Sequence, residues 1–181
     1  MSSLAYGMHH LKKRITINAP AAICYQAWLD SPQLTQVMRR VLRFEYKAEA
    51  IVATNSIEEV LSHLSKQDQD ILPLTQIKQW LFAGPGGKVY KIESTTILEI
   101  PNRFYCATSN DPNDLSIQSS LLFSPDEADQ NTLLEWQISF WVSEHVGEMT
   151  QLVADIQTTN DSFLEDCLQD FKTYVENIEN K

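Results

Sequence analysis

The C-terminal part of the chain carries the pattern that most restricts its fold. From Met149 to Ile178, apolar residues recur at steps of three and four, which is the spacing of one face of a helix. A helix of about thirty residues is about 45 Å long. So long an apolar stripe needs an equally long apolar surface to pack against, and we expect a concave sheet to provide it.

The rest of the sequence supplies strands for such a sheet. Residues 9–18 alternate in polarity and place Leu11, Lys13, Ile15 and Ile17 on one face. The same kind of pattern predicts further strands at 41–53, 77–82, 88–100, 103–109, 115–124 and 132–143. Short turns rich in Gly, Pro, Asn and Asp separate the later strands, so we predict an antiparallel meander.

Two short helices are predicted after the first strand. Pro20 suits the first turn of a helix over Ala21–Leu29, because the missing N–H of proline would have no partner there anyway. Asp30 is placed as the N-cap of a second helix that runs to about Arg39, with Gln33 three residues later as in a capping box. The chain therefore forms a helix pair before the sheet continues.

One domain accounts for nearly the whole chain. We expect residues 1–8 to be a flexible terminus and residues 9–181 to share a single core, for which the length is ordinary. Within that domain, residues 54–79 interrupt the strand pattern. Ile57, Val60, Leu61 and Leu64 have helical spacing, so we predict a helical insertion that could cover an edge or the mouth of the sheet.

Four stretches of sequence, taken in order, resemble one known group of proteins. They are ITINAP at 15–20, WLDSPQL at 28–34, WLFAGPGGK at 80–88 and EIPNR at 99–103. With the order of elements over 9–179, they resemble the START-like (SRPBCC) superfamily, which includes Bet v 1-like proteins and a polyketide cyclase/dehydrase-like branch. Two departures concern the pocket entrance: the long segment 54–79, and the absence of the Trp that often closes the second motif.

This resemblance implies an α+β helix-grip fold. A curved antiparallel β-sheet would wrap around a long C-terminal helix, with the two short helices after the first strand. It also implies a cavity between sheet and last helix that usually takes an apolar or amphipathic molecule. It does not imply one chemistry, so function must be argued from the site.

Candidate ligand-binding residues follow from which side chains face inward. In the last strand Leu134, Trp136, Ile138, Phe140 and Val142 share one face, which has no titratable group, while Trp141 falls on the other. In 88–100 the even positions are expected inside, which includes Tyr90 and leaves Lys91, Glu93 and Glu99 outside. For 103–109 two parities stay open: Phe104 with Cys106, or Arg103 with Tyr105.

The last helix adds two candidates. Phe163 lies on the apolar stripe, and Asn160 sits four residues after Ile156 and three before Phe163. A polar side chain at that place is either a satisfied core amide or a hook for a ligand. The residues predicted to bind a ligand are therefore Tyr90, Phe104, Trp136, Phe140, Asn160 and Phe163.

No catalytic residue, metal site or cofactor is assigned from the sequence. The four histidines include no pair with HxH or HxxxH spacing, so a metal site is not expected. The three cysteines fall on apolar faces and are expected to be inert buried thiols. There is no GxSxG motif, and GPGG at 84–87 precedes a strand rather than a helix, which indicates a turn rather than a phosphate loop.

The charge balance bears on partners and location. The net charge of −10 argues against nucleic-acid binding. Residues 1–50 hold seven Lys or Arg against three Asp or Glu, whereas residues 126–181 hold two against thirteen. The acidic C-terminal helix is either a solvated face or a docking surface for a basic protein. No membrane span or signal peptide is seen, and the odd cysteine count suggests reduced thiols, so a cytoplasmic protein is expected.

Three functions remain open at this point. The charge-poor inner face favours binding of a hydrophobic or amphipathic small molecule that is lipid, polyketide or isoprenoid-like. The first alternative is a polyketide cyclase/dehydrase-like enzyme that uses Tyr90 or a helix amide as a donor. The second is a protein-interaction module without a ligand, which would work through the acidic helix or the segment 54–79.

Overall fold

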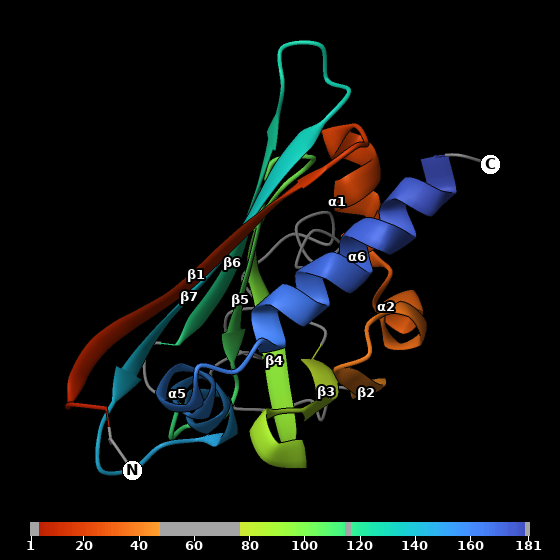
Figure 1. Ribbon diagram of the computed structural model, residues 1–181. Coiled ribbons are helices and arrows are strands. Elements are labelled where there is room, and N and C mark those ends of the chain that lie inside the picture. Colours follow the sequence, from red (N-terminus) through yellow and green to blue (C-terminus); the bar gives the residue numbers. More distant parts are fainter. Residues whose placement is uncertain (1–3, 48–76, 115–116, 180–181) are drawn as a thin grey trace, which may run out of the picture.

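The computed structural model describes residues 4–47, 77–114 and 117–179. Seven strands form one antiparallel sheet in the order β1-β7-β6-β5-β4-β3-β2 (Figure 1). The strands are β1 (Gly7–Ile17), β2 (Val41–Lys47), β3 (Ile77–Ala83), β4 (Val89–Ile100), β5 (Phe104–Ser109), β6 (Gln118–Pro125) and β7 (Thr132–Val142). Strands β2 to β7 follow one another as the predicted meander. Strand β1 pairs with β7 and forms one edge of the sheet.

The helices gather on the concave side of this sheet. They are α1 (Ala21–Leu29), α2 (Ser31–Val37), α5 (Glu148–Thr159) and α6 (Phe163–Glu179), with a 3₁₀ turn η1 (Pro85–Gly87) between β3 and β4. Figure 1 shows α6 lying diagonally across the sheet, with α1 and α2 beside it and α5 near the opposite end. The expected α+β helix-grip architecture is confirmed.

The helix pair after β1 is built as predicted. Helix α1 covers Ala21–Leu29, and the carboxylate of Asp30 accepts a hydrogen bond of 3.2 Å from the backbone N–H of Gln33 at the start of α2. Helix α2 ends at Val37, two residues before the predicted end. Its short length places Leu34 against the core and brings the chain directly to β2.

The C-terminal apolar stripe is not one helix, which corrects the prediction. Asn160 adopts the left-handed conformation, with φ 53° and ψ 42°, and caps the C-terminus of α5. The chain then turns and begins again as α6 at Phe163. Asparagine is one of the few residues that accept this conformation, so Asn160 ends a helix that the spacing alone would continue. The long element that crosses the sheet is α6.

A β-bulge in β4 changes which residues face inward. Thr96 pairs with Ala107 and Leu98 pairs with Cys106, so Ile97 has no opposite residue. Because side chains alternate along a strand, the extra residue reverses the inner and outer faces beyond it. The side chain of Leu98, predicted inside, is 50% exposed. Glu99, predicted outside, lies on the concave face.

Other boundaries differ from those predicted by a few residues. Strand β1 begins at Gly7 and β6 is described from Gln118. The predicted helical insertion over 54–79 lies outside the described residues up to position 76. Residues 77–79, which the two predictions shared, belong to β3, in agreement with the strand predicted at 77–82 and not with the insertion. The part of the strand predicted at 48–53 likewise lies outside the described residues.

Candidate ligand-binding cavity

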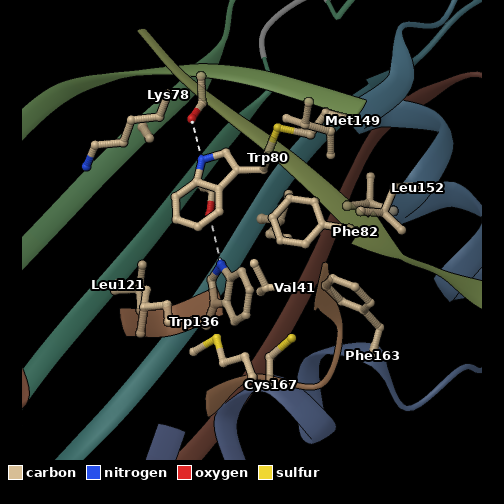
Figure 2. A pocket seen from close by; sticks show the side chains of 18 of the residues that line it. Val41, Lys78, Trp80, Phe82, Leu121, Trp136, Met149, Leu152, Phe163 and Cys167 are labelled. Atoms are coloured by element: carbon tan, nitrogen blue, oxygen red, sulfur yellow. Dashed lines mark hydrogen bonds between the residues drawn. The ribbon is translucent and has the colours of Figure 1, made fainter. Parts of the chain in front are cut away.

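A cavity opens between the concave face of the sheet and the helices (Figure 2). The cavity has a volume of about 90 Å³. Its apolar wall comes from Trp80, Phe82, Ile92, Ala107, Leu121, Trp136 and Ile138 on the strands, and from Trp28, Leu34, Met149, Leu152, Val153, Ile156, Phe163 and Cys167 on the helices. An apolar cavity beneath a sheet suits a small organic molecule.

Aromatic rings make up much of this wall. The rings of Trp80 and Phe82 stack with their centroids 5.8 Å apart, and Phe82 meets Phe163 of α6 edge to face at 5.7 Å. On the other side, Trp28 of α1 meets Trp136 edge to face at 5.6 Å. Such contacts fix the orientation of large rigid rings, and the cavity keeps a defined shape.

Two of the three indole N–H groups in the wall, those of Trp80 and Trp136, are already satisfied. Nε1 of Trp80 donates to Oγ of Ser94 at 3.3 Å, and Nε1 of Trp136 donates to Oγ of Ser119 at 2.8 Å, as the dashed lines in Figure 2 show. Both serines lie on the inner face beside the tryptophans, since Trp136 and Ser119 occupy neighbouring strands β7 and β6. At Trp80 and Trp136 a ligand therefore meets indole rings whose N–H groups already have acceptors.

One part of the cavity is polar. The ammonium Nζ of Lys78 lies 3.4 Å from the hydroxyl of Tyr105, and 5.4 Å from the centre of its ring. The same hydroxyl is 2.9 Å from Oγ1 of Thr96. Lys78 is the one charged residue among the described residues that line the cavity. Lys78 and Phe82 stand four residues apart on β3, so the polar end lies roughly 13 Å along the strand from Phe82.

A second polar pair lies further along β4. The hydroxyl of Tyr25 donates to Oε2 of Glu99 at 3.4 Å. Burial, followed by the negative charge of Glu99, raises the pKa of Tyr25 to about 12. Glu99 is opposite Tyr105 in the sheet, so this pair belongs to the same inner row as the polar end of the cavity.

Two of the six predicted ligand-binding residues line the cavity. They are Trp136 on β7 and Phe163 at the start of α6. Tyr90 is fully buried on the inner side of β4, but it packs under α5, where its hydroxyl donates to the carboxylate of Asp155. Burial, followed by this hydrogen bond, raises the pKa of Tyr90 well above its usual range.

The other three predicted residues lie elsewhere. On β5 the side chains of Tyr105 and Ala107 face the cavity, so Phe104 lies on the outer face of the sheet. Phe140 is fully buried and stacks on His9 of β1, with ring centroids 5.5 Å apart. Asn160 is exposed at the end of α5, where its conformation serves the chain turn.

Lys78 and Tyr105 were missed as site residues for different reasons. Lys78 fell both in the strand predicted at 77–82 and in the insertion predicted at 54–79, and no inner face was assigned to it. Lys78, Trp80 and Phe82 alternate with Ile77, Gln79 and Leu81 as strand residues do. That alternation was the available signal. Tyr105 was one of the two parities left open, and the sequence of β5 contains nothing that decides between them.

The described residues contain no group of three or more His, Cys, Asp or Glu placed to hold a metal ion. None of the helices in the described ranges is long and apolar enough to cross a membrane. Cys106 and Cys167 are buried, and burial raises the pKa of both thiols, so each is held in the protonated form that reacts poorly.

No family model matches the sequence, and comparison with curated proteins gives no match. Solved structures match it well. The di-domain aromatase/cyclase StfQ from the steffimycin biosynthetic pathway superposes with a TM-score of 0.64 at 9% identity, over 97% of this chain and 53% of StfQ. The chain thus spans about half of that protein.

Two other solved structures, each matched over nearly its whole length, show the same architecture. The Zhui aromatase/cyclase from Streptomyces sp. R1128 has a TM-score of 0.63 at 12% identity, over 93% of this chain and 94% of its own. Ginseng major latex-like protein 151 from Panax ginseng has a TM-score of 0.60 at 10% identity, over 92% and 97%. The chain therefore has the same fold as these aromatase/cyclases and the latex-like protein, and the resemblance seen in the sequence is confirmed for the fold alone.

Proposed function

We propose that this protein binds a hydrophobic or amphipathic small molecule in the cavity between the sheet and helices α5 and α6. The observation that carries the proposal is the cavity itself, with a wall of apolar and aromatic side chains. Lipid, polyketide and isoprenoid-like molecules all have the apolar surface that such a wall would cover. Burying that surface would contribute about 25 cal/mol per Å² of apolar area.

Native mass spectrometry of the freshly purified protein tests the proposal. We expect a bound mass in addition to that of the chain, and organic extraction followed by mass analysis would identify the compound. The variant Ala107→Leu should prevent ligand binding, because Ala107 lines the cavity and three more carbons at that position would fill part of it. The variant should lose the bound mass.

Gln118→Leu is the control for that variant. Gln118 lies on the neighbouring strand β6 but on the outer face, opposite Thr108, where an added apolar side chain cannot reach the cavity. It should keep the bound compound. Equal ligand content in wild type, Ala107→Leu and Gln118→Leu would show that any bound compound is elsewhere, and the proposal would fail.

A cyclase/dehydrase-like activity is the second candidate. The observation that favours it is the Tyr105 hydroxyl beside the ammonium of Lys78, which together could donate a proton or hydrogen bonds to a carbonyl oxygen in a cavity of low polarity. Tyr105→Phe separates the two candidates. A binding protein should keep its ligand unchanged in structure, whereas an enzyme should accumulate unreacted substrate when the variant is incubated with it.

The described contacts give less support to an interaction module that uses the acidic helix. Several acids of the C-terminal region are paired within the chain: Arg39–Asp170, Arg40–Asp161, Arg40–Asp166 and Lys13–Glu165. Arg39 alone makes four hydrogen bonds to the carboxylate of Asp170. Basic residues of the N-terminal half therefore form ion pairs with acidic residues in and just before α6.

A further inference from the structure

The polar end of the cavity has an excess of hydrogen-bond donors. The ammonium of Lys78 carries three protons and no acceptor, and only the hydroxyl of Tyr105 lies within hydrogen-bonding distance of it among the described residues. The Tyr105 hydroxyl is in turn shared with Thr96. At least one N–H of Lys78 is left for another acceptor.

No carboxylate of the described residues neutralises Lys78. Its cross-strand neighbours are Tyr46 on β2 and Ser94 on β4, which carry no charge. Glu99, which the bulge brings to the same inner row, is engaged by Tyr25. Outside the cavity, by contrast, Lys12, Lys47 and Lys88 each have a carboxylate partner. Lys78 therefore lines the apolar cavity as a half-buried positive charge that has no anionic partner among residues 4–47, 77–114 and 117–179.

Tyr105 holds this ammonium in place. Its ring lies 5.4 Å from Nζ of Lys78, which is within the range of a cation–π contact. Its hydroxyl, which is fixed by Thr96, limits where Nζ can point. The positive charge is therefore held beside Tyr105 rather than left to swing freely. Figure 2 shows the side chain of Lys78 extending from β3 away from the rings of Trp80 and Trp136.

The cavity has room for a small ring near this charge. Its volume of about 90 Å³ corresponds to roughly six to nine water-sized positions, which is enough for one ring with a short substituent. The walls nearest to Lys78 are Trp80 and Tyr105, whose flat faces suit a planar ring.

We propose that the cavity takes a small planar acid, an aromatic or conjugated molecule with one carboxylate or phenolate, whose anionic oxygen pairs with Lys78 and whose ring lies against Trp80 and Tyr105. This rests on the proposed binding function and specifies its ligand class. Lys78 is the residue that selects the charge of the ligand, and Tyr105 is the residue that positions Lys78.

Benzoate and benzamide test the proposal because they have the same shape and heavy-atom count and differ in charge. Titration of each into ¹⁵N-labelled protein can be followed through the indole N–H signals of Trp80 and Trp136. Trp141 is the internal control, since it points outward from β7 and is 44% exposed. We expect benzoate to bind about ten-fold more tightly than benzamide, which corresponds to about 1.4 kcal/mol.

Variants of Lys78 test whether this residue causes the preference for benzoate over benzamide. Lys78→Met keeps the length of the side chain and should remove the preference for benzoate while leaving benzamide binding unchanged. Lys78→Arg keeps the charge and should restore most of the preference. Lys91→Met is the matched control, because Lys91 is exposed on the outer face of the adjacent strand β4. It should behave as the wild type does.

The outcomes separate this inference from the function on which it rests. Equal binding of benzoate and benzamide at the Trp80 and Trp136 signals would overturn the charge selection by Lys78 and leave the binding cavity standing. The same holds if Lys78→Met keeps the preference. If neither compound moves these two signals and no compound co-purifies with the protein, both the ligand class and the proposed function fail.

Discussion

The hydroxyl of Tyr90 donates a hydrogen bond to the carboxylate of Asp155 and thereby connects the beginning of β4 to helix α5. Asp155 also accepts from Nε2 of Gln151 at 2.7 Å and from Nζ of Lys88 at 3.3 Å. Burial alone would raise the pKa of Asp155, but these three donors outweigh it and hold the pKa below the usual value. Helix α5 is thus fastened to the sheet by one ionised carboxylate.

Tyr90→Phe should lower the free energy of unfolding by about 1–3 kcal/mol at neutral pH, because it removes a hydrogen bond to a charged group in a buried setting. The loss should depend on pH. Asp155 has a depressed pKa in the folded state, so its contribution is present above the unfolded value of about 3.9 and is lost as the pH falls through the folded value. Urea denaturation from neutral pH into this acidic window measures both effects.

Tyr6→Phe provides the comparison for Tyr90→Phe. Tyr6 is 72% exposed, so removal of its hydroxyl should leave the free energy of unfolding unchanged at every pH. The assignment to Asp155 would be wrong if the destabilisation by Tyr90→Phe stayed constant as the pH fell through the acidic window. The Tyr90 hydroxyl would then stabilise the fold by its packing and not by its hydrogen bond to the ionised Asp155.

Asn160→Leu should cost about 1 kcal/mol of stability, because a branched apolar residue is strained in the left-handed conformation that ends α5. Asn160→Gly should be neutral or slightly stabilising at the same position, since glycine adopts positive φ freely. Neither change should alter the amount of co-purified ligand. A loss of ligand in Asn160→Leu at unchanged thermal stability would instead show that this side chain contacts the ligand.

These contacts show why the sequence predicted the architecture better than the site. Alternation in β1 and β7 and the helix pair at 21–37 follow from local patterns, and the structure has them nearly as predicted. The break at Asn160 and the bulge at Ile97 do not interrupt the apolar spacing. One depends on a single backbone conformation and the other on the strand register, so hydrophobic periodicity gives no sign of either.

Such local changes in backbone conformation and register affect the prediction of the site more than the prediction of the fold. A slip of one residue moves every later side chain of a strand to the other face, so the bulge exchanges Leu98 for Glu99 on the inner side. That Trp136 and Phe163 face the cavity could be predicted because both lie in long regular elements. The alternation around Lys78 places it on the same face as Trp80 and Phe82, but it overlaps the predicted insertion, so the inner face of that strand was not assigned.

Asp114→Ala should destabilise the protein by about 1–2 kcal/mol. The Asp114 carboxylate is buried and caps α5 from a separate loop, accepting from the backbone N–H groups of Met149 at 3.2 Å and Thr150 at 2.9 Å, and from Oγ of Ser109 at 2.7 Å. Asp30→Ala removes a cap with one hydrogen bond at an exposed position and should cost only about 0.5 kcal/mol. Thermal and urea denaturation of both variants gives the comparison, and equal losses would contradict the role given to Asp114.

Glu99→Gln should lower the pKa of Tyr25 from about 12, because the nearby negative charge disfavours the tyrosinate form. The pKa should stay above the ordinary value of about 10, since burial is the larger cause. The ultraviolet absorbance of tyrosinate, followed against pH, measures this step, and its absence in Tyr25→Phe identifies it. Glu93→Gln is the matched control, because Glu93 precedes the bulge and faces outward toward Lys47. An unchanged Tyr25 step in Glu99→Gln would mean that Glu99 does not lie on the concave face, and the reversal of β4 at Ile97 would have to be abandoned with it.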